Sequence, residues 1–418
     1  MKIENENQID QPDTMLQVMA SEGLKKRVTA ILVKYPEHNT EQQVYQDRLV
    51  SELNIIKQAQ LSGYFLMLSD IVKWAKDHDI PVGPGRGAIV GSLVAYAIRI
   101  TDVDPLRYNL IFERFLSSER RIMPVVDFDV CIDRHDEVVQ NVVKKYGGDL
   151  DSDGCRLRIH LPVNRDHAVS SVMRAEMKDV EATTTVKLNF QGLKYLTSNN
   201  KAVQLIRAGK SPDFDLADLR DDDPATFKLI ASGNTKNTFQ FESGGMNDFI
   251  RQLKPNCFED LIVAISLFRP VPIETGMAHD FIRRKHGHKK IVYELPQLVS
   301  VLKDTYGVII YQEQFLEIIH TAGGYSFGEA DLLRRELIKM NVAAFTIRKK
   351  QFLAGAKRQG ICAKNTVRKI FNRVTQYCGQ HYFLKAHAAA YAMISYQSAY
   401  LKAHYPEEFK AAFRSHPK

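Results

Sequence analysis

The sequence of 418 residues is poor in cysteine and has no long apolar run. Its five cysteines are scattered and form no Cys-x-x-Cys pair, which argues against a disulfide framework and favours a reducing compartment. No stretch of about 18 apolar residues occurs, so we expect no transmembrane helix and no membrane partner. The N-terminus is polar and acidic and lacks the basic and then apolar order of a signal peptide, so we expect a cytoplasmic protein.

Charge, by contrast, is abundant and unevenly distributed. The net charge is +8. Residues 207–226 are acidic, whereas basic clusters lie at 283–290, 334–335 and 348–350. Such clusters suit a polyanionic partner such as nucleic acid, but they also suit solvated helix faces, and composition leaves both interpretations open.

The spacing of apolar residues predicts a mainly helical chain with a few strands. Helices are expected at 15–60, 63–76, 89–96 and 136–146, and over most of the chain after about residue 224. Strands are expected around Asp127 and Asp129, at 156–163, at 186–190 and at 308–311. A turn-rich break is expected at 269–272, where two prolines occur.

One expected strand carries two aspartates within the apolar run Met123–Val130. Alternation at period two puts Asp127 and Asp129 on the same face of the strand. Two carboxylates held so close repel each other unless a cation lies between them, and Mg²⁺ prefers such oxygen ligands. The pattern is therefore a candidate two-metal phosphoryl-transfer site, although most D-x-D strands are solvated faces or turn ends.

A glycine-rich loop, Gly83–Gly87, precedes this strand. Glycines let backbone N–H groups approach an anion, and Arg86 could add a charged fork for a phosphate. No G-K-[ST] follows, so the loop is not a P-loop, and no apolar strand precedes it, so it does not fit a dinucleotide fingerprint. A tight turn between two helices remains the alternative.

Ordered motifs around these two features carry a family resemblance. The first block contains G-Y-F-L, G-P-G-R-G, I-T-D-V-D-P-L, L-I-F-E-R-F-L and D-F-D. The second contains F-Q-F-E-S, C-F-E-D-L-I, Y-Q-E-Q, A-D-L-L-R-R, H-A-A-A-Y-A and Y-L-K-A-H-Y-P-E-E-F. Over roughly 20–412, with a weak stretch at 147–182, the chain resembles the bacterial DNA polymerase III alpha subunits, the family C replicative polymerases.

The resemblance implies an α+β fold that is mainly helical. It implies a polymerase-beta-like nucleotidyltransferase palm with a small mixed sheet, and a helical fingers region. On this basis we expect a disordered lead over 1–14, a helical lead-in and palm over 15–223, and fingers over 224–418. The thumb is expected to be reduced or missing at about 147–182.

The resemblance also implies a site that binds primer–template DNA, a dNTP and Mg²⁺, with other replisome subunits as partners. Asp127 and Asp129 match two of the family's three metal-binding aspartates, Asn189 stands at the third position, and Lys187 lies beside it. The nucleotide-binding positions that it implies are Gly85, Arg86, Gly87, Ala88, Arg334, Arg335, Lys385 and His387.

The departures from the family pattern concentrate on the chemistry. Asn189 is neutral where the family has an aspartate, and Ala88 lacks the hydroxyl of the family's serine. Ile89 and Val90 add bulk to the glycine loop. A preceding phosphoesterase domain and any segment after the fingers are also expected to be absent. Three interpretations therefore stay open: a DNA polymerase with impaired activity, a catalytically inactive remnant that binds DNA or a replisome partner, and a decayed gene product without a role.

Overall fold

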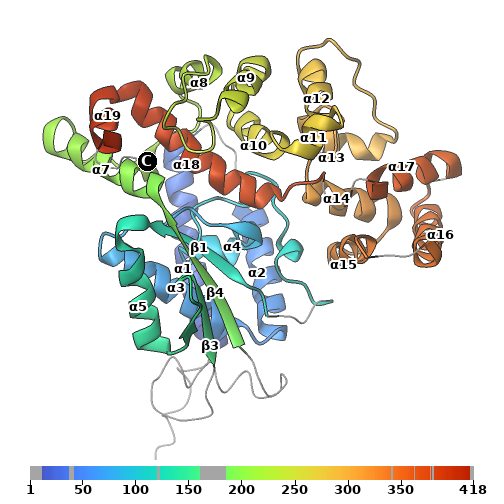
Figure 1. The fold of residues 1–418 in the computed structure, drawn as a ribbon. Coiled ribbons are helices and arrows are strands. Elements are labelled where there is room, and N and C mark those ends of the chain that lie inside the picture. The colour runs from blue at the N-terminus through green and yellow to red at the C-terminus, as the bar shows by residue number, and fades with distance from the viewer. Residues whose placement is uncertain are drawn as a thin grey trace, which may run out of the picture. The chain divides into compact units, whose positions relative to one another are not determined.

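The computed structural model describes residues 12–36, 42–119, 123–160, 185–339, 342–361, 363–376, 378 and 381–414. The chain forms two compact units, the first made of Met1–Thr226 with Met393–Lys418 and the second of Phe227–Ala392 (Figure 1). Among the described residues, no helix combines the length and the hydropathy needed to span a bilayer.

The first unit opens with three helices, α1 (Pro12–Lys34), α2 (Gln42–Gln58) and α3 (Ser62–Asp77). α1 begins within the segment expected as a disordered lead, of which residues 1–11 lie outside the described part. The helical region expected over 15–60 thus contains α1 and α2. α3 is buried along most of its length, because its own apolar residues lie on nearly all sides of the helix and do not form a single stripe.

A four-stranded mixed sheet forms the centre of the first unit, in the order β1–β4–β3–β2. β1 (Val126–Cys131) pairs in parallel with β4 (Thr185–Leu193), and β3 (Arg156–His160) pairs antiparallel with β4. β2 (Asp149–Leu150) pairs antiparallel with β3. The expected α+β fold with a small mixed sheet is confirmed; the predicted strand at 156–163 is described only as far as residue 160.

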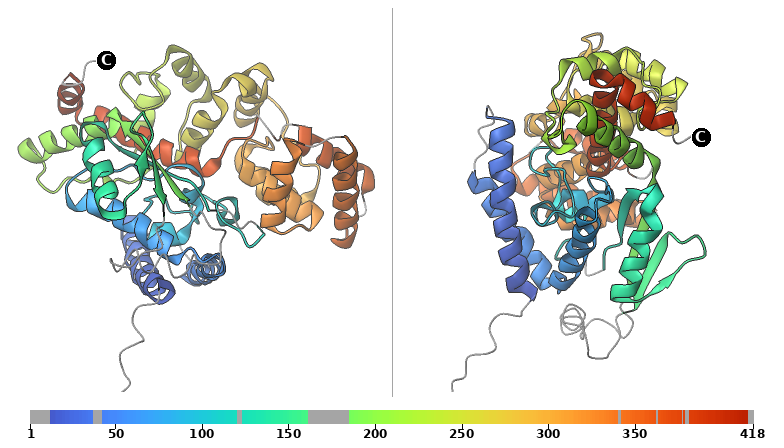
Figure 2. Two further views of the ribbon diagram at one scale, coloured as in Figure 1. Left: turned by 60° about the horizontal axis from the view of Figure 1, so that its bottom comes forward. Right: turned by 90° about the vertical axis from the view of Figure 1, so that its left-hand side faces the viewer.

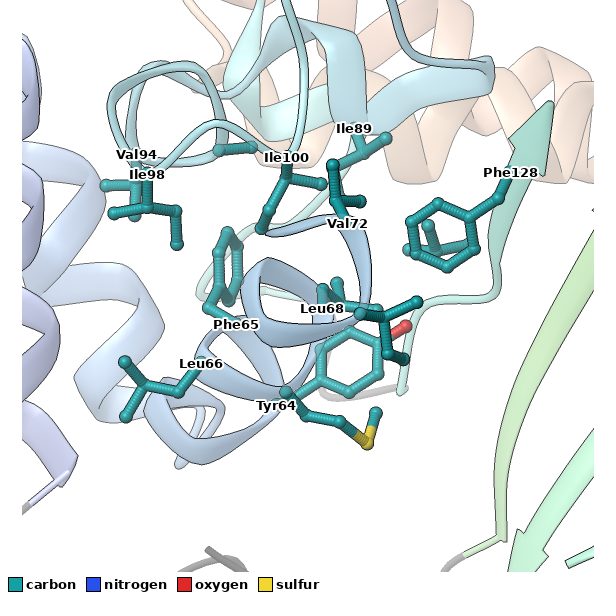
Figure 3. Packing of buried hydrophobic residues seen from close by; sticks show 14 of the residues in the cluster. Tyr64, Phe65, Leu66, Leu68, Val72, Ile89, Val94, Ile98, Ile100 and Phe128 are labelled. Carbon is teal, nitrogen blue, oxygen red and sulfur yellow. The ribbon is translucent and has the colours of Figure 1, made fainter. Parts of the chain in front are cut away.

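One face of this sheet is apolar and the other is polar. The apolar face includes Phe128 and Phe190, whose rings stack with centroids 5.3 Å apart. α5 (His135–Tyr146) follows β1 and runs alongside β3 and β4, as Figures 1 and 2 show. Figure 3 shows Tyr64, Phe65 and Leu68 of α3 in the same apolar cluster as Phe128. This core fixes β1 and leaves its aspartates on the opposite, polar face.

The helix expected at 89–96 is split into two short pieces. A 3₁₀ turn covers Gly87–Gly91, and α4 covers Leu93–Ala97. Ser92 separates them and caps α4, since its hydroxyl accepts a hydrogen bond from the Ala95 N–H. The buried Glu52 accepts two further N–H bonds of α4, from Leu93 at 2.9 Å and Val94 at 3.1 Å.

β4 leads directly into α7 (Lys194–Gly209), against which α19 (Pro406–Arg414) packs. Their contact is an apolar cluster that includes Ile206, Leu401 and Phe409. The C-terminal residues of the chain therefore belong to the first unit. α18 (Lys385–His404) begins in the second unit and ends in the first.

In its described residues the second unit is helical. Its remaining helices are α8 (Pro224–Ala231), which begins in the first unit, α9 (Gly244–Leu253), α10 (Phe258–Leu267), α11 (Pro270–Glu274), α12 (Met277–Lys285), α13 (Val299–Leu302), α14 (Gln312–Gly323), α15 (Phe327–Leu337), α16 (Val342–Arg358) and α17 (Lys364–Gln376).

One expectation for this unit holds only in part and one is wrong. The break expected at 269–272 is found at Phe268 and Arg269, between α10 and α11, but Pro270 already stands in the first turn of α11, where its missing N–H is not needed. The strand expected at 308–311 is absent from this described segment: only Tyr311 forms an isolated bridge, to Phe383. The apolar run is buried because it leads into α14, not because it joins a sheet.

Candidate functional site

The two aspartates of β1 lie on the polar face of the sheet. The Asp127 side chain is 34% exposed, whereas that of Asp129 is 1% exposed. In the parallel register Asp127 lies opposite Asn189, and Asp129 lies opposite Gln191. The Asn189 amide donates a hydrogen bond to Asp127 Oδ1 at 2.5 Å. Asn189, at the predicted third ligand position, therefore lies beside Asp127.

The glycine-rich loop runs along the other edge of β1. The Gly83 N–H donates to the Asp129 carbonyl at 2.8 Å, and the Cys131 N–H donates to the Pro81 carbonyl at 2.9 Å. Gly85 has a φ of +122°, and a Cβ there would lie 2.9 Å from side-chain carbons of Val90 and Thr101. Only glycine fits this position without strain, because Val90 and Thr101 pack closely against it.

This loop places Arg86 across both carboxylates. Its Nη1 donates to Asp129 Oδ1 at 2.9 Å, and its Nε lies 3.9 Å from Asp127 Oδ2. The Arg86 backbone is extended, with φ −147° and ψ 140°. Gly87 and Ala88 begin the 3₁₀ turn directly after it. Of the predicted site residues, Gly85, Arg86, Asp127, Asp129 and Asn189 therefore come together.

The polar face extends across β4 and β3. Lys187 is exposed on β4 and lies opposite Arg158, while Arg156 lies opposite Asn189. The side chains of Arg156 and Arg158 are 64% and 56% exposed, and both lie near Asp151. Sequence reasoning did not name these two arginines as site residues, although the alternation in Arg156–His160 is the signal that reveals them.

Tyr64 of α3 fixes the segment that leads into β1. Its hydroxyl is buried and donates to the Pro124 carbonyl at 2.9 Å. Burial raises the pKa of Tyr64 well above its ordinary value, and the negative charge of Asp127 raises it further. The phenol therefore stays protonated and acts as a donor.

The remaining predicted nucleotide-binding residues belong to the second unit. Arg334 is buried and pairs with Asp331 at 3.0 Å, and Arg335 pairs with the same carboxylate at 2.6 Å. Burial lowers the pKa of Lys385, although the nearby Glu313 opposes this shift. The His387 ring lies 4.1 Å from that of Tyr391, centroid to centroid.

The donor groups of this site fit a divalent cation only in part. Asp127 and Asp129 provide the hard oxygen ligands that Mg²⁺ prefers. At the third position the Asn189 amide donates a hydrogen bond toward Asp127 instead of offering a third carboxylate. Within the described ranges, no group of three or more His, Cys, Asp or Glu residues is placed to hold a metal. The two aspartates suit one cation, but a three-carboxylate set for two cations is not present there.

Comparison with known proteins identifies the family. The family model of the bacterial DNA polymerase III alpha NTPase domain matches residues 14–153, and that of the alpha subunit finger domain matches residues 195–360. The chain is 34% identical over 492 residues to the DNA polymerase III subunit alpha of Escherichia coli K12, covering 94% of this chain and 42% of the relative. This chain belongs to the DNA polymerase III alpha family.

Other DNA polymerase III alpha subunits give the same result. Those of Campylobacter jejuni and Pseudomonas aeruginosa are 35% identical over 96% of this chain, which covers 41% and 42% of their lengths. The chain thus spans about two fifths of the relatives that it matches. The aligned stretch with Escherichia coli, 492 residues, is longer than this chain of 418 residues, so the relative has internal segments that this chain lacks. Residues 154–194 lie between the two matched domains.

Proposed function

We propose that this chain is the palm and fingers of a DNA polymerase III alpha-type protein, which extends a primer on template DNA with dNTPs during cytoplasmic DNA replication, at a reduced rate. The observation that carries the proposal is the placement of Asp127 and Asp129 beside the Arg86 loop on one exposed sheet face. Family membership supports it independently.

In this proposal the first unit contains a polymerase-beta-like palm and the second contains the fingers. Support for the palm comes from the parallel pairing of β1 with β4, which brings the third ligand position next to Asp127. The thumb would be the shortened segment around 147–182, much of which lies outside the described residues.

Each group has a task in nucleotidyl transfer. Asp127 and Asp129 would hold Mg²⁺, which would supply positive charge to the phosphates and lower the pKa of the primer 3′-hydroxyl. The N–H groups at Gly85–Ala88 and the Arg86 guanidinium bind the triphosphate. In the fingers, the nucleotide-binding residues would be Arg334, Arg335, Lys385 and His387.

The reduced rate follows from Asn189 and Ala88. Because Asn189 is neutral, the cation site has one negative charge fewer than the family pattern. Ala88 has no hydroxyl group, so the triphosphate loop has one hydrogen-bond donor fewer. Losing one charged ligand costs several kcal/mol of transition-state stabilisation, which corresponds to a rate factor on the order of thousands.

A primer-extension assay with Mg²⁺ or Mn²⁺ tests the proposal. We expect slow extension by the natural chain and none by the Asp127→Ala variant. Extension that survives Asp127→Ala would place the chemistry elsewhere, and no extension by the natural chain would overturn the proposal of synthesis.

A second candidate function is DNA binding without synthesis. It is favoured by the hydrogen bond from Asn189 to Asp127, because an amide donor in this place opposes a cation. The exposed Arg156 and Arg158 provide a phosphate-binding face in either case.

In a salt titration of DNA binding, the double substitution Arg156→Ala with Arg158→Ala is expected to lower the slope of log affinity against log salt concentration by about 2. The same substitutions at Arg207 and Lys210, at the end of α7, serve as the control. An unchanged slope would rule out this face as a DNA contact.

A further inference from the structure

Arg86 is positioned as a counter-ion for both aspartates. Its guanidinium hydrogen-bonds to Asp129 at 2.9 Å and lies 3.9 Å from Asp127. The Asp129 side chain is almost fully buried, so its charge needs a nearby positive group. Arg86 provides this charge from within the chain.

The backbone just before Arg86 is hydrogen-bonded to two other segments of the chain, β1 and the loop at Asp102. The Gly83 N–H bonds to the Asp129 carbonyl, and the Asp102 N–H bonds to the Pro84 carbonyl at 2.9 Å. The crowding around Gly85 adds to this restraint. A change of partner at Arg86 is therefore a rotation of a side chain that is 30% exposed and does not require the loop to unfold.

A divalent cation and the Arg86 guanidinium would use the same carboxylate oxygens. Two positive groups at one pair of carboxylates repel each other, so each weakens the binding of the other. A polyphosphate that reaches the glycine loop offers the guanidinium a second anionic partner. Such an exchange would remove the guanidinium from both carboxylates, while Asn189 would still donate its hydrogen bond to Asp127.

We infer that Arg86 is an internal counter-ion that competes with divalent cations for Asp127 and Asp129, and that nucleotide phosphates release it. The cation and the nucleotide consequently bind with positive coupling. The inference rests on the proposed function, since it takes the two aspartates as the cation site. Arg86 would alternate between two partners, the carboxylates and the nucleotide phosphates, and cation binding would be weak without nucleotide.

The test is an Mn²⁺ titration of the full chain, followed by electron paramagnetic resonance, without DNA or nucleotide. We expect Arg86→Gln to bind Mn²⁺ about tenfold more tightly than the natural chain, within the usual range of coupling between sites. The gain should disappear when Asp129→Asn is added. Arg207→Gln, which removes the same charge elsewhere in the first unit, should leave the affinity unchanged.

A second variant guards against misfolding. Arg86→Lys keeps the charge but loses the planar fork, so it should give a smaller gain than Arg86→Gln. Circular dichroism of each variant confirms its fold. Equal or weaker Mn²⁺ binding by folded Arg86→Gln and Arg86→Lys would overturn the inference. Because no DNA synthesis is measured, a failed primer-extension assay would overturn the proposed synthesis and leave this result standing.

Discussion

At the third ligand position of the site, Asn189 differs from an aspartate by a single atom. The nitrogen in place of an oxygen turns an acceptor into a donor and removes a charge. Here the amide donates to Asp127, while Arg86 pairs with Asp129. The amide hydrogen bond and the guanidinium charge together offset the repulsion between the two aspartates, whereas three carboxylates would need cations to hold them together.

Asn189→Asp should therefore make the fold dependent on metal. In EDTA the variant is expected to lose about 1–3 kcal/mol of stability, because a hydrogen bond becomes a contact between like charges. Addition of Mn²⁺ should then raise its melting temperature more than that of the natural chain. Asn109→Asp, an exposed position with the same charge change, is the control. Identical Mn²⁺ responses of both variants would contradict this role of the third ligand position.

A second residue makes the stability depend on pH. Burial raises the pKa of Glu317 to about 7; nearby Lys385 opposes the shift, and Glu313 and Asp304 add to it. Because the folded pKa lies above the unfolded one, the stabilisation is complete below about pH 4.5 and is lost as the pH rises through about 7.

Glu317→Gln mimics the protonated carboxyl and should flatten this dependence. Melting temperatures at about pH 5 and about pH 8 measure it. The natural chain should be less stable at the higher pH, and the variant should change much less. Parallel curves for the two proteins would show that Glu317 does not titrate in this range.

At the scale of elements, the site depends on how the loop before it is packed against β1. The loop adds backbone hydrogen bonds to the edge of β1 away from β4. β1 is thus held on both edges, and its two aspartates are fixed in direction. Supporting elements of this kind hold the side chains of a site close to one geometry.

Gly85→Ala tests this packing. The new Cβ would lie 2.9 Å from carbons of Val90 and Thr101, at a φ of +122°. We expect a loss of about 1–3 kcal/mol in stability. Gly147→Ala is the matched control, since Gly147 also has a positive φ but a Cβ there would meet no atom within 4 Å. Equal losses at the two glycines would mean that backbone strain, and not crowding, decides the effect.

Local pattern predicted the elements that carry strong periodicity. α3, α5 and β1 are found where the apolar residues place them, because α5 buries one apolar stripe, β1 packs Phe128 into the core, and α3 is buried on nearly all sides. The pattern failed where burial has other causes. The run at 308–311 is apolar because it lies in a helical core, and residues 270–272 are helical because proline is tolerated in the first turn of a helix.

The sequence predicted several residues of the site, but it did not predict their contacts. The spacing of Asp127 and Asp129 indicated their common face, and the family resemblance indicated Asn189 and Arg86. The pairing of Arg86 with Asp129 is a tertiary contact that no local pattern contains. Arg156 and Arg158 share the face only because β3 pairs with β4 in one register.

At the scale of the molecule, the chain comprises two units of a DNA polymerase III alpha-type protein. The first contains the carboxylates and the Arg86 loop, and the second contains Arg334, Arg335, Lys385 and His387. Residues 154–194, between the two matched domains, include β3 and β4 and therefore supply Asn189 to the site. The chemistry is accordingly expected in the first unit.

The most direct measurement of that expectation is incorporation of a single nucleotide on a defined primer–template in Mn²⁺, with each dNTP offered separately. We predict slow addition of the complementary dNTP by the natural chain and none by Asp127→Ala. We also predict that Asn189→Asp alone restores little, because Ala88 leaves the triphosphate loop altered. Addition that is indifferent to template or to Asp127, or no addition by the natural chain, would contradict the proposed synthesis.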